Sequence, residues 1–132
     1  MDTNSTNVVD PNILYKELSY KIVGLAMDVH NELGYGFLEK VYENALMVLF
    51  EENGIKAVQQ YAIPVRFHGR VVGDYFADIV VDDSVILELK AQDRIVEIHK
   101  AQALHYLRAT SYRLALLINF GKHRLEYERI VL

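Results

Sequence analysis

Two segments in the N-terminal half of the chain carry apolar residues at steps of three and four, the spacing of one face of an α-helix. The first begins after Asp10-Pro11, a pair that suits a helix start, and ends at Gly34. Its apolar residues are Leu18, Ile22, Leu25, Val29 and Leu33. The second begins near Phe37 and ends before Gly54, and its apolar side consists of Leu38, Val41, Tyr42, Ala45, Leu46 and Leu49. The pattern predicts two consecutive helices.

The pattern then changes to the alternation and short apolar runs of β-strands. Strands are predicted over 58–67, 71–81, 85–90, 112–120 and 124–132, and a third helix over 98–109. The His68-Gly69 pair suits a tight hairpin turn, and Asp82-Asp83-Ser84 suits the next turn. The predicted order is helix, helix, three strands, helix and two strands.

This order predicts a single α/β domain over residues 11–132, preceded by a flexible tail over residues 1–10 that has little apolar surface to bury. The chain has 132 residues, of which 52% are hydrophobic and 24% charged, as in an ordinary globular domain. No apolar run approaches the ~20 residues of a membrane span, and the N-terminus lacks the pattern of a secretion signal. We therefore expect a cytoplasmic protein without a membrane partner.

The absence of cysteine and the charge balance narrow the chemistry. Without cysteine, only oxygen and imidazole ligands are available to a metal, which favours Mg²⁺ or Mn²⁺. The 14 Lys and Arg residues against 18 Asp and Glu residues give a net charge of −4, which provides no general attraction to a polyanion. A carboxylate site whose bound cations reverse its local charge remains compatible with a nucleic-acid substrate.

Charged residues interrupt the otherwise apolar run 85–90. Glu88 and Lys90 are two positions apart, so they project from one face of a strand at a spacing of about 6–7 Å. Asp78 lies in the preceding apolar strand, and the hairpin turn between the strands brings its carboxylate beside Glu88. Such a pair repels unless a cation lies between the two groups. We therefore predict a divalent metal held by Asp78, Glu88 and the Leu89 carbonyl, although an isolated Glu-x-Lys is usually a solvated strand end or a structural ion pair.

These residue types match the requirements of phosphodiester hydrolysis, which needs oxygen ligands for a hard cation, a polarised phosphate and an activated water. In this hypothesis Asp78 and Glu88 hold the metal. Lys90 orients the attacking water or stabilises the charge that develops on the phosphate.

The pattern of Asp78 followed by Glu88-Leu89-Lys90 on the next strand is similar to the signature of the PD-(D/E)xK nuclease superfamily. The segment Gly36-Phe37-Leu38-Glu39-Lys40-Val41-Tyr42 resembles the GxxExxY motif that names one family within it. The stretches 29–34, 101–107 and 116–121 also look like that family, so the resemblance covers nearly all of residues 13–132. One departure is Ala77, which stands where the signature has Pro. That position supplies no metal ligand, so the departure does not affect the predicted site.

The resemblance implies a restriction-endonuclease-like three-layer α/β fold, in which helices flank a mixed sheet of four or five strands. It also implies that Glu39 completes the metal site, directly or through water. Without the resemblance, Glu39 would be interpreted as a solvent-exposed residue on a helix. Gln102 and Tyr106 are one helical turn apart and share a face with His99. They resemble an element that positions substrate or Lys90 in parts of the superfamily, and the alternative is a Tyr that packs on the sheet beside a satisfied Gln.

The leading functional hypothesis is a metal-dependent nuclease that acts on DNA. The alternative is a non-catalytic nucleic-acid or protein interaction module that retains the fold, and the acidic charge balance favours it. A glycosidase with two carboxylates ranks last, because the chain has no Trp to form a sugar platform. The pattern leaves the oligomeric state open, a homodimer included.

Overall fold

The structure is a computed structural model that describes residues 15–132, so the predicted tail and the Asp10-Pro11 helix start lie outside the described residues. The described residues form three helices and five strands, in the predicted order. The elements are α1 (Lys16–Leu33), α2 (Glu39–Glu52), β1 (Ala57–Phe67), β2 (Arg70–Val81), β3 (Val85–Lys90), α3 (Glu97–Arg108), β4 (Leu114–Asn119) and β5 (Glu126–Val131).

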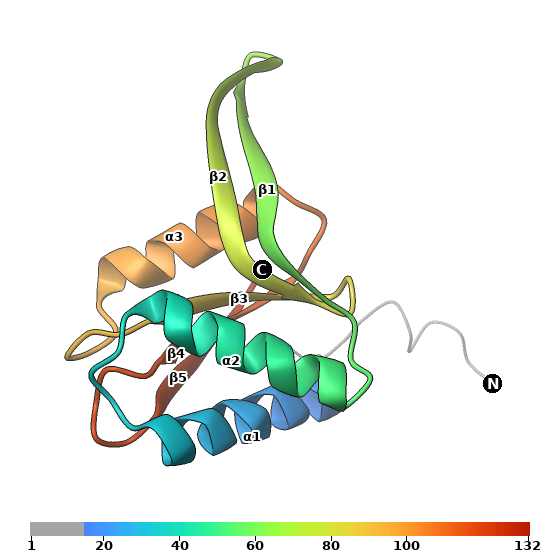
Figure 1. Ribbon diagram of the computed structural model, residues 1–132. Helices are drawn as coiled ribbons and strands as arrows, with labels where there is room; N and C mark the ends of the chain where they lie inside the picture. The colour runs from blue at the N-terminus through green and yellow to red at the C-terminus, as the bar shows by residue number, and fades with distance from the viewer. Residues whose placement is uncertain (1–14) are drawn as a thin grey trace.

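The five strands form one mixed sheet in the order β1-β2-β3-β4-β5. Neighbouring strands are antiparallel except β3 and β4, which are parallel and are connected through α3. Helices α1 and α2 cover one face of the sheet and α3 lies across the other (Figure 1). The predicted three-layer α/β fold with a mixed five-stranded sheet is therefore confirmed.

The core has one apolar cluster on each face of the sheet. The cluster under α1 and α2 includes Leu46, Leu87 and Leu116, and the cluster under α3 includes Ile86 and Leu107. Strands β3 and β4 are buried on both faces, which explains why both read as nearly continuous apolar runs. Glu88 is thus a charged residue in the most buried part of the sheet.

Apart from the start of α1, which lies at Lys16, element boundaries agree with the predictions to within one or two residues, and both predicted turns are present. His68 and Gly69 have positive φ angles of 50° and 77°, as the tightest hairpin turns require. Asp82 and Asp83 have positive φ angles of 52° and 51°. The start of α2 near Phe37 is corrected to Glu39.

Strands β1 and β2 extend well beyond the segment in which β2 pairs with β3. Only Ile79, Val80 and Val81 of β2 pair with β3, whereas the pairing of β1 with β2 continues to Phe67 and Arg70. The remainder is a two-stranded ribbon that projects from the domain (Figure 1). We call residues 61–76 the arm. No helix among the described residues is long and apolar enough to cross a membrane.

Candidate active site

Asp78 and Glu88 lie where β2 and β3 separate. The last paired residues of the two strands are Ile79 and Leu87. Beyond them, side chains replace the backbone ladder. The Asp78 N–H donates to Glu88 Oε2 at 3.0 Å, and the Leu89 N–H donates to Asp78 Oδ2 at 2.7 Å. The fork between the strands therefore brings both carboxylates together beside Leu89.

A backbone irregularity at Gln60 redirects the strands at this point. Gln60 has a φ of 52° and lies opposite Asp78 in the β1–β2 register, between the pairs that flank it. Residues two apart on a strand normally share a face. Ile79, however, belongs to the cluster under α1 and α2, and Ala77 belongs to the cluster under α3. The buried face therefore switches at Asp78, where the arm begins to leave the sheet.

Glu43 is a buried carboxylate that the sequence analysis did not assign to the site. It is 4% exposed and accepts hydrogen bonds from Gln59 Nε2 at 2.7 Å and Gln60 Nε2 at 3.1 Å. The left-handed backbone of Gln60 lets these consecutive side chains reach the same group. The available signal was the i, i+4 spacing of Glu39 and Glu43, which places them on one face of α2.

Burial is the main influence on the two central carboxylates. It raises the pKa of Asp78 to about 6 and the pKa of Glu88 to about 8. The negative charge of Asp78 further raises the pKa of Glu88, and Glu43 and Glu39 do the same for Asp78. Lys90 lowers the pKa of both groups without cancelling the effect. The fork is therefore a place where added positive charge is favourable.

Lys90 ends β3 and is half-buried. Within residues 15–132 its ammonium group makes no hydrogen bond or ion pair, although its charge acts on Asp78 and Glu88. His99 lies nearby at the start of α3, where its Nδ1 accepts the Val96 N–H at 3.2 Å. Burial lowers the pKa of His99, and Lys90 adds to the effect. Lys90 is thus a positive group beside the carboxylates.

The loop that follows Lys90 is held by hydrogen bonds from the side chain of Asn119, which is fully buried. Asn119 Oδ1 accepts the N–H groups of Gln92 and Gly121, each at 3.0 Å, and Nδ2 donates to the Gln92 carbonyl at 2.9 Å. A Cβ at Gly121 would overlap the backbone of Gln92. Only glycine fits there, so the loop and the end of β3 are held in one position.

Tyr42 fixes the loop between α1 and α2. Its hydroxyl donates to the Gly34 carbonyl at 2.7 Å and accepts the Phe37 N–H at 3.2 Å. Its buried ring stacks on Phe120 with the centroids 4.5 Å apart. Gly36 has a φ of 111°, a backbone conformation that favours glycine. The Gly and Tyr of the GxxExxY segment therefore set where α2 begins.

Glu39 is the first residue of α2, half-buried, and acidic groups are favourable in the first turn of a helix. Its charge acts on the pKa values of Asp78, Glu88 and His99, so it faces the fork. Within residues 15–132, no three His, Asp or Glu side chains are assembled as a metal-binding group. Glu39 as a metal ligand, directly or through water, stays a prediction.

Tyr106 and Gln102 approach the fork from α3. Burial raises the pKa of Tyr106 to about 12, and the charges of Glu88 and Asp78 contribute to this rise. The Tyr106 ring also contacts Tyr75 of the arm, with the ring centroids 5.9 Å apart. Gln102 is half-buried and lies beside Tyr106 in a groove between α3 and the arm. Their role in positioning substrate stays a prediction.

The chemistry of the donor set fits a hard divalent cation. Within the described residues, Asp78 Oδ1 and Glu88 Oε1 make no hydrogen bond, since the hydrogen bonds to these groups use the other oxygen of each. Each carboxylate therefore keeps one oxygen available for a metal. All the predicted ligands, the Leu89 carbonyl included, are oxygens, as Mg²⁺ and Mn²⁺ prefer.

The mixed sheet flanked by helices, with an Asp and a Glu-x-Lys at the strand fork, defines a restriction-endonuclease-like domain. A family model described as the PD-(D/E)XK nuclease superfamily matches residues 16–130. The chain belongs to this superfamily, whose members generally use divalent metals. The match is to the superfamily, so membership of the GxxExxY family stays a prediction.

Comparison with other proteins adds one fold-level likeness. A search of the curated proteins found no match. Among solved structures, the "Crystal structure of SSO0001" is similar with a TM-score of 0.52 and 19% identity over 92% of this chain. The chain spans 61% of the length of that structure. At this identity the likeness concerns the fold alone.

Proposed function

We propose that this chain is a metal-dependent nuclease of the GxxExxY type that hydrolyses phosphodiester bonds, with DNA as its substrate. The observation that carries the proposal is the pair of hydrogen bonds that joins Asp78 to Glu88 and to Leu89 at the strand fork, with the Lys90 ammonium beside them and unpaired within residues 15–132. Membership of a nuclease superfamily supports the same class of reaction.

Each residue has a chemical task in this proposal. Asp78 and Glu88 hold Mg²⁺ or Mn²⁺, together with the Leu89 carbonyl and with Glu39, directly or through water. The cation supplies Lewis acidity to the phosphate and to the attacking water. Lys90 stabilises the charge that develops on the phosphate or orients the water.

The second candidate is a binding module without turnover. It is favoured by the net charge of −4 and by the absence, within residues 15–132, of an assembled group of three metal-binding side chains. Against it stands the energetic cost of burying two neighbouring carboxylates. A module that only binds has no need to keep that pair in the centre of its sheet.

Cleavage of labelled oligonucleotides tests the proposal. We expect wild-type protein to cleave DNA with Mg²⁺ or Mn²⁺, and cleavage to disappear when EDTA removes the metal. Lys90→Ala should remain folded and lose about 10²–10³-fold in rate, the typical cost of losing a preorganised charge. The matched control is Lys21→Ala, an exposed lysine on α1, which should cleave like wild type.

Two outcomes would overturn the proposal. One is a folded wild-type protein that binds nucleic acid and cleaves neither DNA nor RNA with either metal, which is the behaviour of a binding module. The other is Lys90→Ala cleavage within a few-fold of wild type, which would remove Lys90 from the reaction. An RNA oligonucleotide of the same sequence separates the two substrate classes.

A further inference from the structure

The arm has one face toward α3 and one face away from it. Ile63 packs in the cluster under α3, so alternation along β1 also turns Val65 and Phe67 to that side. The cross-strand partners of Ile63 and Phe67 are Tyr75 and Arg70. We call this set the inner face of the arm.

The inner face and α3 enclose a groove. It is lined by Val65 and Tyr75 from the arm and by Gln102, His105, Tyr106 and Arg108 from α3. We call it the arm groove. Tyr106 lines it and lies near the fork, since the charges of Glu88 and Asp78 raise its pKa. The arm groove is therefore next to the proposed catalytic carboxylates.

The charge of the arm groove is opposite to that of the chain as a whole. No Asp or Glu lines it, although the sequence has 18 acidic residues. Arg108, and Arg70 beyond Tyr75 on the inner face, are exposed and make no ion pair within residues 15–132. The free cations and the missing acids make this surface complementary to a polyanion.

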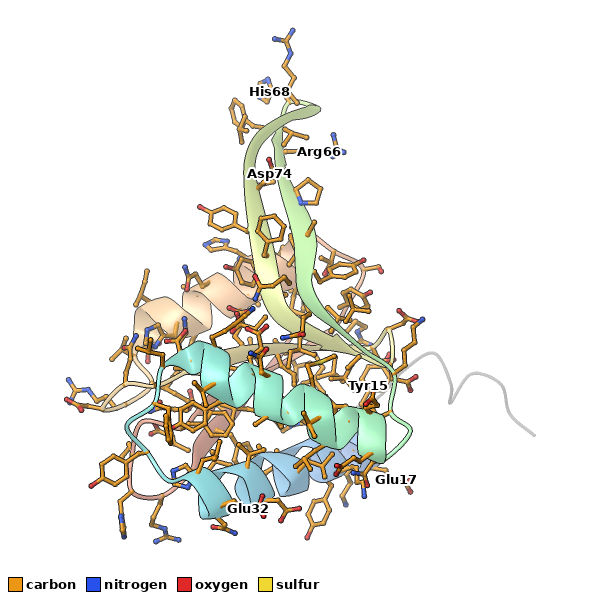
Figure 2. The ribbon with its side chains drawn as sticks, viewed as in Figure 1. Tyr15, Glu17, Glu32, Arg66, His68 and Asp74 are labelled. Atoms are coloured by element: carbon orange, nitrogen blue, oxygen red, sulfur yellow. The ribbon has the colours of Figure 1, made fainter. Side chains whose placement is uncertain are left out.

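The inner face of the arm also carries partly exposed aromatic rings. Tyr75 is 48% exposed and Phe67 is 64% exposed. A two-stranded ribbon is at best marginally stable by itself, and exposed apolar groups of this kind mark a binding surface. Figure 2 shows Arg66, His68 and Asp74 on the arm, clear of the helices.

We propose that the arm groove binds a single-stranded stretch of nucleic acid and leads it to Asp78 and Glu88, with a base stacked on Tyr75 and phosphates paired with Arg108 and Arg70. The destination at the carboxylates rests on the proposed nuclease function, whereas binding in the groove does not. A single strand fits because its bases are free to stack on aromatic rings, at about 1–3 kcal/mol per base. Duplex recognition relies on many phosphate contacts, about 6–10 in strongly salt-dependent cases. The groove offers Arg108, and the inner face beside it adds only Arg70.

The test measures binding without cleavage, by fluorescence anisotropy of labelled oligonucleotides of about 12 residues in EDTA. Wild type should bind the single strand more tightly than a blunt duplex of the same sequence. Tyr75→Ala and Arg108→Ala should each weaken binding about fivefold or more, and Tyr75→Trp should restore it because an aromatic ring is kept. DNA and RNA strands are compared in parallel, because both carry the stacked bases and phosphates that the groove recognises.

The arm supplies its own matched controls. Phe76 is 50% exposed but pairs with Ala62, on the outer face, and Arg66 pairs with Val71 on that same face. Phe76→Ala and Arg66→Ala should leave the affinity unchanged. Circular dichroism melts establish that every variant is folded.

Several results would overturn the proposal. These are preference for the duplex, equal losses for inner-face and outer-face variants, or a sedimentation mass that changes from dimer to monomer in Tyr75→Ala, which would make the arm a contact between copies of the chain. Failure of the nuclease function is distinguishable. If the protein never cleaves but binds single strands through Tyr75, the nuclease proposal fails and the groove proposal stands. If the protein cleaves and Tyr75→Ala binds normally, the groove proposal fails and the nuclease proposal stands.

Discussion

Glu39 and Glu43 lie one turn apart on α2, yet their surroundings differ. Glu43 is buried, and Gln59 and Gln60 both donate to its carboxylate. Glu39 is half-buried and makes no hydrogen bond within residues 15–132 through its side chain. We infer that Glu43 holds α2 against β1, whereas Glu39 is available to a ligand.

Paired substitutions separate these roles. Glu39→Gln should weaken Mn²⁺ binding and cleavage while the melting temperature stays the same or rises, because one charge leaves a repulsive cluster. Glu43→Ala should lower the melting temperature, since Gln59 and Gln60 both lose their acceptor on α2, and each such hydrogen bond contributes about 0.5–1.5 kcal/mol. Calorimetric Mn²⁺ titrations beside thermal melts provide both readouts. Unchanged Mn²⁺ affinity with a lowered melting temperature in Glu39→Gln would make Glu39 a structural residue.

At the scale of elements, the loop between α1 and α2 depends on one hydroxyl. Tyr42 joins the Gly34 carbonyl to the Phe37 N–H and so fixes the first turn of α2, where Glu39 lies. Tyr42→Phe should lower the free energy of unfolding by about 1–2 kcal/mol, the cost of unpaired part-buried groups. Urea unfolding measures this change. Tyr20→Phe, on an exposed ring of α1, is the control, and equal stabilities of the two variants would contradict the role of the Tyr42 hydroxyl.

Much of this element structure was predictable from the sequence. The 3.6-residue period predicted the helical face and the end of α1, and the apolar runs predicted β3 and β4 because both strands are buried on two faces. The positive φ of Gln60 was not predictable, since a left-handed residue inside a strand leaves no periodic signal. That angle switches the buried face at Asp78 and lets the arm leave the sheet.

The same contrast holds within the site. The proximity of Asp78 and Glu88 followed from a short turn and strand alternation, which are local properties. The burial of Glu43 depends on Gln59 and Gln60 of another element, and such a contact is decided by tertiary packing. The direction of Glu39 needed the family resemblance, because the helix period alone does not say which face meets the fork.

At the scale of the whole molecule, the site makes stability depend on pH. The pKa of Asp78 rises from 3.8 to about 6 and that of Glu88 from 4.5 to about 8, mainly through burial. The folded state therefore binds more protons than the unfolded state between about pH 4 and pH 8. The ionised forms are disfavoured in the folded state. The contribution of these two groups to the free energy of unfolding of metal-free protein falls as the pH rises through this range.

We expect thermal melts in EDTA to show this loss, and Glu88→Gln to reduce it because one of the two titrating groups is removed. The wild-type and Glu88→Gln curves, measured together, separate this contribution from that of Glu39, Glu43, Lys90 and His99, which all face the fork. Mn²⁺ should raise the melting temperature of wild type more at pH 8 than at pH 5, because protons compete with the metal. Parallel pH profiles for the two proteins would contradict the raised pKa of Glu88.

Anomalous diffraction from a crystal of the protein soaked in Mn²⁺, at a concentration that supports cleavage, tests directly whether Asp78 and Glu88 hold the metal. We expect a Mn²⁺ peak between Asp78 and Glu88, with oxygen ligands from both side chains at about 2.0–2.3 Å. A crystal in which both carboxylates keep only their backbone hydrogen bonds, with Mn²⁺ bound elsewhere or not at all, would contradict it.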